Sequence, residues 1–121
     1  MMSSLGIIGH GFVGAAQARA WSEWTDVRIY DVIPEKSSHP FGDVATREIV
    51  FLCLPTPNDP NHNICDTSII EEMLAKINDI VGEENPRAIV IKSTVPVGFT
   101  RAMAARFPDL HLLRPDRDWE T

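Results

Sequence analysis

Leu5-Gly6-Ile7-Ile8-Gly9-His10-Gly11-Phe12-Val13-Gly14 is the stretch that decides the fold. A short apolar run opens onto three glycines in the spacing Gly-x-Gly-x-x-Gly, and an alanine-rich segment follows. This order predicts a buried strand, a tight turn and a helix, the unit that holds a pyrophosphate at a helix N-terminus. We expect Gly9 to make the turn, Gly11 to let a ligand approach the backbone, and Gly14 to let the helix pack against the sheet.

Asp31 closes the next apolar run, Val27–Tyr30, where such units place a carboxylate for a ribose. It can accept hydrogen bonds from the ribose hydroxyls, and its charge would repel a 2′-phosphate, so the sequence favours NAD over NADP. Arg28 does not reverse this preference, because on a strand it lies on the opposite face from Asp31. The alternative is that Asp31 only begins a turn.

Composition limits the kinds of protein this chain can be. With 121 residues, 44% of them hydrophobic and 23% charged, it is expected to form one globular domain over residues 1–121. The net charge of -6 argues against nucleic acid or an anionic membrane as a partner. No apolar run approaches a membrane span, and no signal-peptide pattern opens the chain. Cys53 and Cys65 have no disulfide or metal spacing, so we expect no metal and a cytoplasmic location.

The remaining chain alternates predicted strands with predicted helices. The strands are Val27–Tyr30, Ile49–Leu54, Ala88–Ile91 and Leu110–Leu113, and helices are expected over 68–81 and 99–107. Ser68 and Glu71 predict a capping box at the first of these helices. Residues 32–46 read as a loop or a broken short helix, and 58–65 as a polar loop. The alternation predicts an α/β fold, a Rossmann-like doubly wound parallel sheet in the strand order 3-2-1-4-5.

Ligands of such a sheet bind beyond the carboxyl ends of its strands. That rule selects the candidate cofactor-binding residues, which are Gly9, His10, Gly11, Phe12, Val13, Gly14, Asp31, Val32, Pro55, Thr56, Pro57, Ser93 and Thr94. Some have simpler interpretations. The side chain of His10 is expected to face solvent, and the alternative interpretation of Thr56 is that it only stops a strand. Ser93 and Thr94 could cap the next helix or reach a nicotinamide, and capping is the simpler interpretation for at least one of them.

Three segments carry a resemblance to a known family. They are Gly9-His10-Gly11-Phe12-Val13-Gly14, Phe51-Leu52-Cys53-Leu54-Pro55-Thr56-Pro57 and Ile91-Lys92-Ser93-Thr94-Val95-Pro96-Val97-Gly98-Phe99-Thr100. In this order they resemble the NAD-binding domain of the UDP-glucose/GDP-mannose dehydrogenase family. The resemblance implies oxidation of the C6 alcohol of a nucleotide sugar to a carboxylate with two NAD per turnover. It also implies cofactor contacts by the glycines, Asp31 and Thr56, and catalytic roles for Thr94 and Glu120.

The chain also departs from that family. It is shorter between the second and third predicted strands, and of residues 114–120 only Pro115 and Glu120 match. The sugar-nucleotide domain, the central dimer helix and the nucleophilic cysteine are missing, so we expect a truncated enzyme that is not catalytically complete. The alternatives are a free-standing protein that sequesters or senses a dinucleotide, and an interaction scaffold. Expected sheet edges at the third and fifth strands also favour self-association, as a homo-oligomer or with a missing domain.

Overall fold

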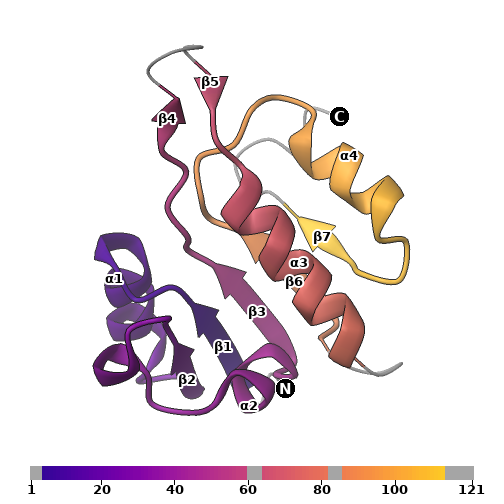
Figure 1. Cartoon of the computed structure of the whole chain (residues 1–121). Helices are drawn as coiled ribbons and strands as arrows, with labels where there is room; N and C mark the ends of the chain where they lie inside the picture. The colour runs from indigo at the N-terminus through magenta and orange to yellow at the C-terminus, as the bar shows by residue number, and fades with distance from the viewer. Residues whose placement is uncertain (1–3, 60–63, 82–85, 114–121) are drawn as a thin grey trace.

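The computed structural model describes residues 4–59, 64–81 and 86–113 (Figure 1). Strands and helices alternate along these residues, as the sequence predicts. The strands are β1 (Ser4–Ile8), β2 (Asp26–Tyr30), β3 (Ile49–Leu52), β4 (Asn58–Asp59), β5 (Ile64–Cys65), β6 (Ala88–Ile91) and β7 (Leu112–Leu113). The helices are α1 (Phe12–Trp21), the 3-10 turn η1 (Pro34–Lys36), α2 (Phe41–Ala45), α3 (Ser68–Ile80) and α4 (Phe99–Arg106).

Five parallel strands form the main sheet in the order β2-β1-β3-β6-β7. The fold class is therefore confirmed, but the strand order 3-2-1-4-5 is corrected, because the third strand lies on the other side of β1 from β2. The usual order 3-2-1-4-5-6 places a further strand outside β2 before the chain crosses back. Here the chain crosses back at once through η1 and α2, and the observed order is the usual one without that strand. The edges of the sheet are consequently β2 and β7, whereas the third strand is central.

The helices divide between the two faces of the sheet. The connection from β1 through α1 runs outward to β2, and the later connections run the other way, so right-handed crossovers place α1 on one face and the other helices on the opposite face. The side chains agree with this division. Ala18 of α1 packs with Leu5, Ile7 and Phe51, whereas α2, α3 and α4 bury the larger cluster that contains Ile8, Leu52 and Ile91.

The N-cap of helix α3 lies one residue earlier in the sequence than predicted. Its N-cap is Thr67, so Ser68 is the first helical residue and the predicted Ser68–Glu71 capping box is wrong. The Thr67 hydroxyl donates to the Glu71 carboxylate at 2.7 Å, and the Ser68 amide donates to Asp66 Oδ1 at 2.9 Å. Asp66 competes successfully for the amide because its carboxylate lies two residues before it, the geometry of a local Asx turn.

Two connections contain more structure than predicted. Residues 32–46 form η1 and the five-residue α2, in agreement with a broken short helix. The predicted polar loop at 58–65 contains the short antiparallel pair β4–β5, which projects from the carboxyl end of β3 (Figure 1). The segment 114–121, with Glu120, lies outside the described residues.

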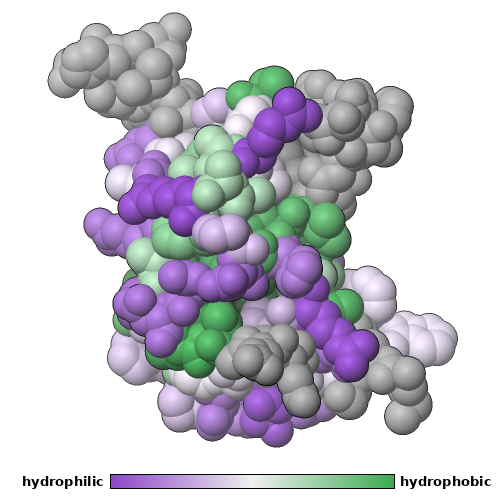
Figure 2. Space-filling view, turned by 90° about the vertical axis from the view of Figure 1, so that its right-hand side faces the viewer, coloured by the Kyte–Doolittle hydropathy of each residue, from purple (hydrophilic) through white to green (hydrophobic). Residues whose placement is uncertain are grey.

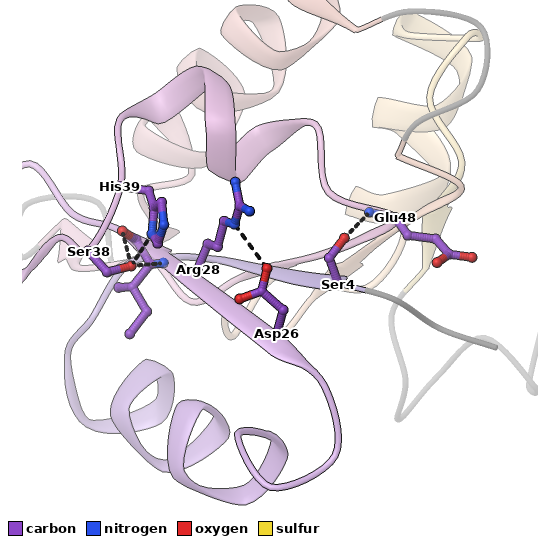
Figure 3. A network of polar contacts seen from close by, with 7 residues as sticks. Ser4, Asp26, Arg28, Ser38, His39 and Glu48 are labelled. Carbon is purple, nitrogen blue, oxygen red and sulfur yellow. Dashed lines mark hydrogen bonds and ion pairs between the residues drawn. The ribbon is translucent and has the colours of Figure 1, made fainter.

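The outer edge of β2 is covered by serine side chains and backbone from the connection that follows η1. The Ser38 hydroxyl accepts the Ile29 amide at 2.8 Å, and the Ser38 amide donates to the Ile29 carbonyl at 2.9 Å (Figure 3). One residue earlier, the Ser37 hydroxyl accepts the Asp31 amide at 2.8 Å and donates to the Asp31 carbonyl at 2.9 Å. These contacts occupy the positions at which a neighbouring strand would bond.

The surface seen from the side of α4 and β7 mixes hydrophilic and hydrophobic areas (Figure 2). Several large hydrophobic side chains are exposed elsewhere, including Phe12 at 98% and Val32 at 76%. Among the described residues, no helix is both long enough and apolar enough to cross a membrane.

Candidate functional site

The three glycines of the glycine-rich turn, residues 9–14, differ in their surroundings. Gly9 follows β1 with φ +101°, a conformation that favours glycine, and a Cβ there would overlap the Cys53 carbonyl. A Cβ at Gly14 would overlap the Gly9 carbonyl, so glycine is required for α1 to pack against the turn. A Cβ at Gly11, by contrast, would meet no atom within 4 Å. The free space at Gly11 is where a ligand could approach the backbone.

Helix α1 begins next to that space. Its N-cap is Gly11, and the hydrogen bond from the Ala15 amide to the Gly11 carbonyl measures 2.9 Å. The amides of the first helical turn have no acceptor within the helix, and the helix dipole adds positive potential at this end. The start of α1 can therefore bind an anionic group through its backbone.

A cavity of about 690 Å³ opens beside the turn, at the carboxyl ends of β1, β2 and β3. Gly9, Gly11, Phe12 and Val13 form one wall, and residues 31–33 after β2 form a second. Residues 53–55 after β3 and one side of α3 complete it. A volume of this size suits an organic ligand, and the point between β1 and β3 is the switch point at which such sheets bind nucleotides.

Asp31 joins two walls of the cavity through its carboxylate. The His10 amide donates to Oδ2 at 2.7 Å, and the Ile33 amide donates to Oδ1 at 2.9 Å. Burial acts to raise the pKa of this carboxyl, but these two hydrogen bonds and the nearby charge of Lys36 outweigh it and lower the pKa below its usual value. Asp31 is therefore ionised at neutral pH.

Ser93 and Thr94 follow β6 and have separate surroundings. Ser93 is buried, and its hydroxyl accepts the Leu54 amide at 2.8 Å and donates to the Leu52 carbonyl at 3.3 Å. Ser93 therefore ties the carboxyl end of β6 to that of β3, next to the cavity wall. Thr94 is exposed. The prediction that one of them caps α4 is wrong, because the N-cap of α4 is Gly98 with φ +88°.

Cys53 lines the cavity and is a free thiol. Burial raises its pKa to about 11, while the charge of Lys92 acts in the opposite direction with less effect. The thiol is neutral at pH 7 and is a poor nucleophile. Within residues 4–59, 64–81 and 86–113, no cluster of three or more histidine, cysteine or acidic side chains could hold a metal ion.

Comparison with known proteins identifies the family of the chain. Residues 36–110 match the model of the NAD binding domain of the UDP-glucose/GDP-mannose dehydrogenase family. The matched segment includes Pro55-Thr56-Pro57 and the stretch 93–98, and it begins after the glycine-rich turn. The chain belongs to the UDP-glucose/GDP-mannose dehydrogenase family. It contains the NAD-binding domain of that family, and the geometry of the glycine-rich turn supports the same cofactor from residues outside the match.

The chain is also similar to individual proteins. UDP-glucose 6-dehydrogenase of Campylobacter jejuni is 35% identical over 60 residues, and an uncharacterized protein of Methanocaldococcus jannaschii is 35% identical over 72 residues. These matches cover 50% and 60% of this chain but only 14% and 8% of those proteins.

A GDP-mannose dehydrogenase from Pseudomonas aeruginosa superposes with a TM-score of 0.70 at 19% identity, over 89% of this chain and 34% of that one. At that identity the structural likeness shows the fold alone. The chain thus spans about a third of the length of this neighbour and a much smaller share of the curated relatives.

The structure brings many of the predicted site residues of this dehydrogenase-family domain to one cavity. Gly9, Gly11, Phe12, Val13, Asp31, Val32 and Pro55 line it. His10 and Gly14 support the turn, through an amide and through close packing. Thr56 is half-buried between the exposed Pro55 and Pro57, and Thr56, Pro57, Ser93 and Thr94 do not line the cavity.

Sequence reasoning missed the wall that α3 contributes. Ile69, Glu72, Met73 and Lys76 face the cavity at spacings of three and four residues, so they occupy one side of the helix. That periodicity was a usable signal, since it lies beside the apolar stripe of Ile70, Leu74 and Ile77.

Proposed function

We propose that the cavity between β1 and β3 is the NAD site of a nucleotide-sugar dehydrogenase. The observation that carries the proposal is the free space at Gly11, below the first turn of α1 and in the same cavity as Asp31. Close approach of a phosphate to backbone requires that space, and an ionised carboxylate beside it suits ribose hydroxyls. NAD binding is the activity of this family domain, and the residues that hold the cofactor are our proposal.

The pyrophosphate, the adenosine ribose and the adenine of the cofactor would each meet a different part of the cavity. The pyrophosphate would lie over Gly11, Phe12 and Val13, where the first amides of α1 can donate to its oxygens. The adenosine ribose would bond the remaining acceptor positions of Asp31. The adenine would lie between the apolar side chains of residues 32–33 and of Ile69 and Met73 in α3.

The activity of the whole enzyme is proposed from the family. NAD would accept the hydride removed from the C6 carbon of a UDP-sugar or related nucleotide sugar. Thr94, exposed at the carboxyl end of β6, is the residue that we propose beside the nicotinamide, with Ser93 fixing the strand end that carries it. Glu120 keeps its proposed catalytic role by resemblance. The free Cys53 thiol fits a reducing cytoplasm, where we propose that the protein acts.

Calorimetric titration of the purified chain with NAD and with NADP tests the proposal. We expect saturable NAD binding and at least tenfold weaker binding of NADP, because Asp31 would face the 2′-phosphate. Addition of UDP-glucose, with NADH formation as the readout, tests turnover by the chain separately from cofactor binding. Failure of both dinucleotides to bind would rule out the proposal, and equal affinities would remove the role of Asp31 in cofactor choice.

A further inference from the structure

The Asp31 carboxylate is bonded to protein on both of its oxygens in the structure. One partner, His10, lies between the first two glycines of the glycine-rich turn, and the other, Ile33, lies in the wall beyond β2. Both donors are backbone amides, at 2.7 and 2.9 Å from the carboxylate oxygens. Because an ionised acceptor forms stronger hydrogen bonds than a neutral one, these contacts restrain the backbone on both sides of the cavity.

The position of Asp31 is itself fixed by its surroundings. The Ser37 hydroxyl bonds both the amide and the carbonyl of Asp31, at 2.8 and 2.9 Å. On the other side of β2, the Gly9 amide donates to the Tyr30 carbonyl at 2.8 Å, which extends the β1–β2 pairing to the start of the turn. The carboxylate therefore projects from a backbone position that is held from both edges of the strand.

We propose that Asp31 is a positioning residue for the glycine-rich turn, in addition to its contact with the ribose. Its carboxylate holds the His10 amide, and thereby fixes the backbone between Gly9 and Gly11 in the conformation that receives the pyrophosphate. A carboxylate offers about four lone-pair positions, so two backbone amides leave room for two ribose hydroxyls. The inference rests on the proposed NAD site, and it assigns part of the affinity for the pyrophosphate to a residue that does not touch it.

The two roles of Asp31 can be separated with a cofactor analogue. We would compare NAD with an analogue whose adenosine ribose lacks the 2′ and 3′ hydroxyls, in the wild-type chain and in Asp31→Ala. If Asp31 positions the turn, Asp31→Ala weakens binding of both ligands by about tenfold or more, because the turn loses a charge-assisted hydrogen bond. If Asp31 acts only on the ribose, the substitution leaves the affinity for the analogue unchanged, and that result would overturn the proposal.

A second measurement uses the protein without any ligand. Hydrogen exchange followed by NMR reports the His10 and Ile33 amides directly, and we expect both to exchange at least tenfold faster in Asp31→Ala. Asp26→Ala is the matched control, since Asp26 is in the same strand and bonds Arg28 rather than the turn. Unchanged protection of His10 in Asp31→Ala would contradict the proposal even if NAD binds.

Asp31→Asn is a second, more conservative variant that can be tested if Asp31→Ala does not fold. Its side chain keeps one acceptor oxygen but turns an NH2 group toward the other amide, so we expect one of the two amides to lose protection and the other to keep it. Protection of both amides at the wild-type level would count against the carboxylate as the restraint. Because exchange is measured without cofactor, loss of protection in the variants together with no NAD binding by the wild-type chain would refute the proposed function and leave the restraint itself established.

Discussion

A single methyl group distinguishes the roles of the glycines. A Cβ at Gly11 has free space around it, and Gly11 has an extended backbone that alanine can adopt, whereas a Cβ at Gly14 would overlap the Gly9 carbonyl. We predict that Gly11→Ala changes the free energy of unfolding by no more than about 1 kcal/mol but weakens NAD binding at least tenfold. Gly14→Ala should lower the free energy of unfolding by about 3 kcal/mol. Urea denaturation and NAD titration measure the two effects.

Gly42→Ala is the matched control for these variants. A Cβ at Gly42 also meets nothing within 4 Å, but Gly42 lies in α2, away from the cavity. It should leave NAD affinity unchanged. A Gly11→Ala variant that binds NAD as well as Gly42→Ala does would show that the free space at Gly11 is not used by the cofactor.

The buried thiol of Cys53 gives a prediction for alkaline pH. Its pKa is raised from the ordinary value of 9.0 to about 11, so between these values the unfolded chain releases the thiol proton while the folded chain keeps it. The unfolded state then binds fewer protons, and stability falls as pH rises through this window. We expect Cys53→Ala to flatten the fall in the midpoint of urea denaturation between pH 9 and pH 11. Parallel curves for the two proteins would refute the assigned pKa.

Residue types alone predicted the geometry of the glycine-rich turn and the place of Asp31 beside it, because both depend on local backbone geometry. They predicted Ser68 and Ser93 poorly. A serine hydroxyl bonds whichever group the fold brings near, and Asp66 takes the Ser68 amide while Ser93 reaches a strand that is distant in the sequence. Such partners follow from the tertiary arrangement and are not encoded in a spacing.

At the scale of elements, the outer edge of β2 depends on two serines. The Ser37 hydroxyl bonds both the amide and the carbonyl of Asp31. The Ser38 hydroxyl accepts the amide of Ile29 (Figure 3). We predict that Ser37→Ala lowers the free energy of unfolding by about 1 to 2 kcal/mol, because it removes the partner of two partly buried backbone groups. It should also weaken NAD binding, since Asp31 loses part of its support. Denaturation and titration test both effects.

Ser22→Ala is a suitable control for the edge serines. Ser22 follows α1, and its exposed hydroxyl makes only a 3.3 Å contact to the Arg19 carbonyl. Its replacement should change stability by no more than about 0.5 kcal/mol. Equal effects of Ser37→Ala and Ser22→Ala would mean that the hydrogen bonds along β2 contribute little.

The strands and most helices could be predicted because their periodicity is strong, and Ala88–Ile91 agrees to the residue. The order of the strands could not. The order depends on whether the chain forms a further strand outside β2 before it crosses β1 to the other half of the sheet. Residues 32–46 contain no signal that shows whether such a strand forms or whether a short helix leads directly across β1.

At the scale of the whole molecule, the cavity joins both layers of the domain. Its lining comes from α1 on one face of the sheet and from α3 on the other. We predict that NAD at one hundred times its dissociation constant adds about 2.7 kcal/mol to the free energy of unfolding, which should raise Tm by roughly 6 to 20 °C. Differential scanning calorimetry measures the shift. NADP at the same concentration should give a smaller one, and an equal shift would contradict the selectivity assigned to Asp31.

The serine-covered edge of β2 also bears on how this fold can change in evolution. A strand at the margin of a parallel sheet can be lost without altering the order of the strands that remain, provided that the chain crosses back directly, as it does here through η1 and α2. The new margin needs only partners for a few backbone groups, and two serine hydroxyls and the amides of Ser38 and His39 supply them here. Gene shortening between β2 and β3 is therefore compatible with an intact nucleotide site. The same segment is a natural place to graft a strand when the domain is re-engineered.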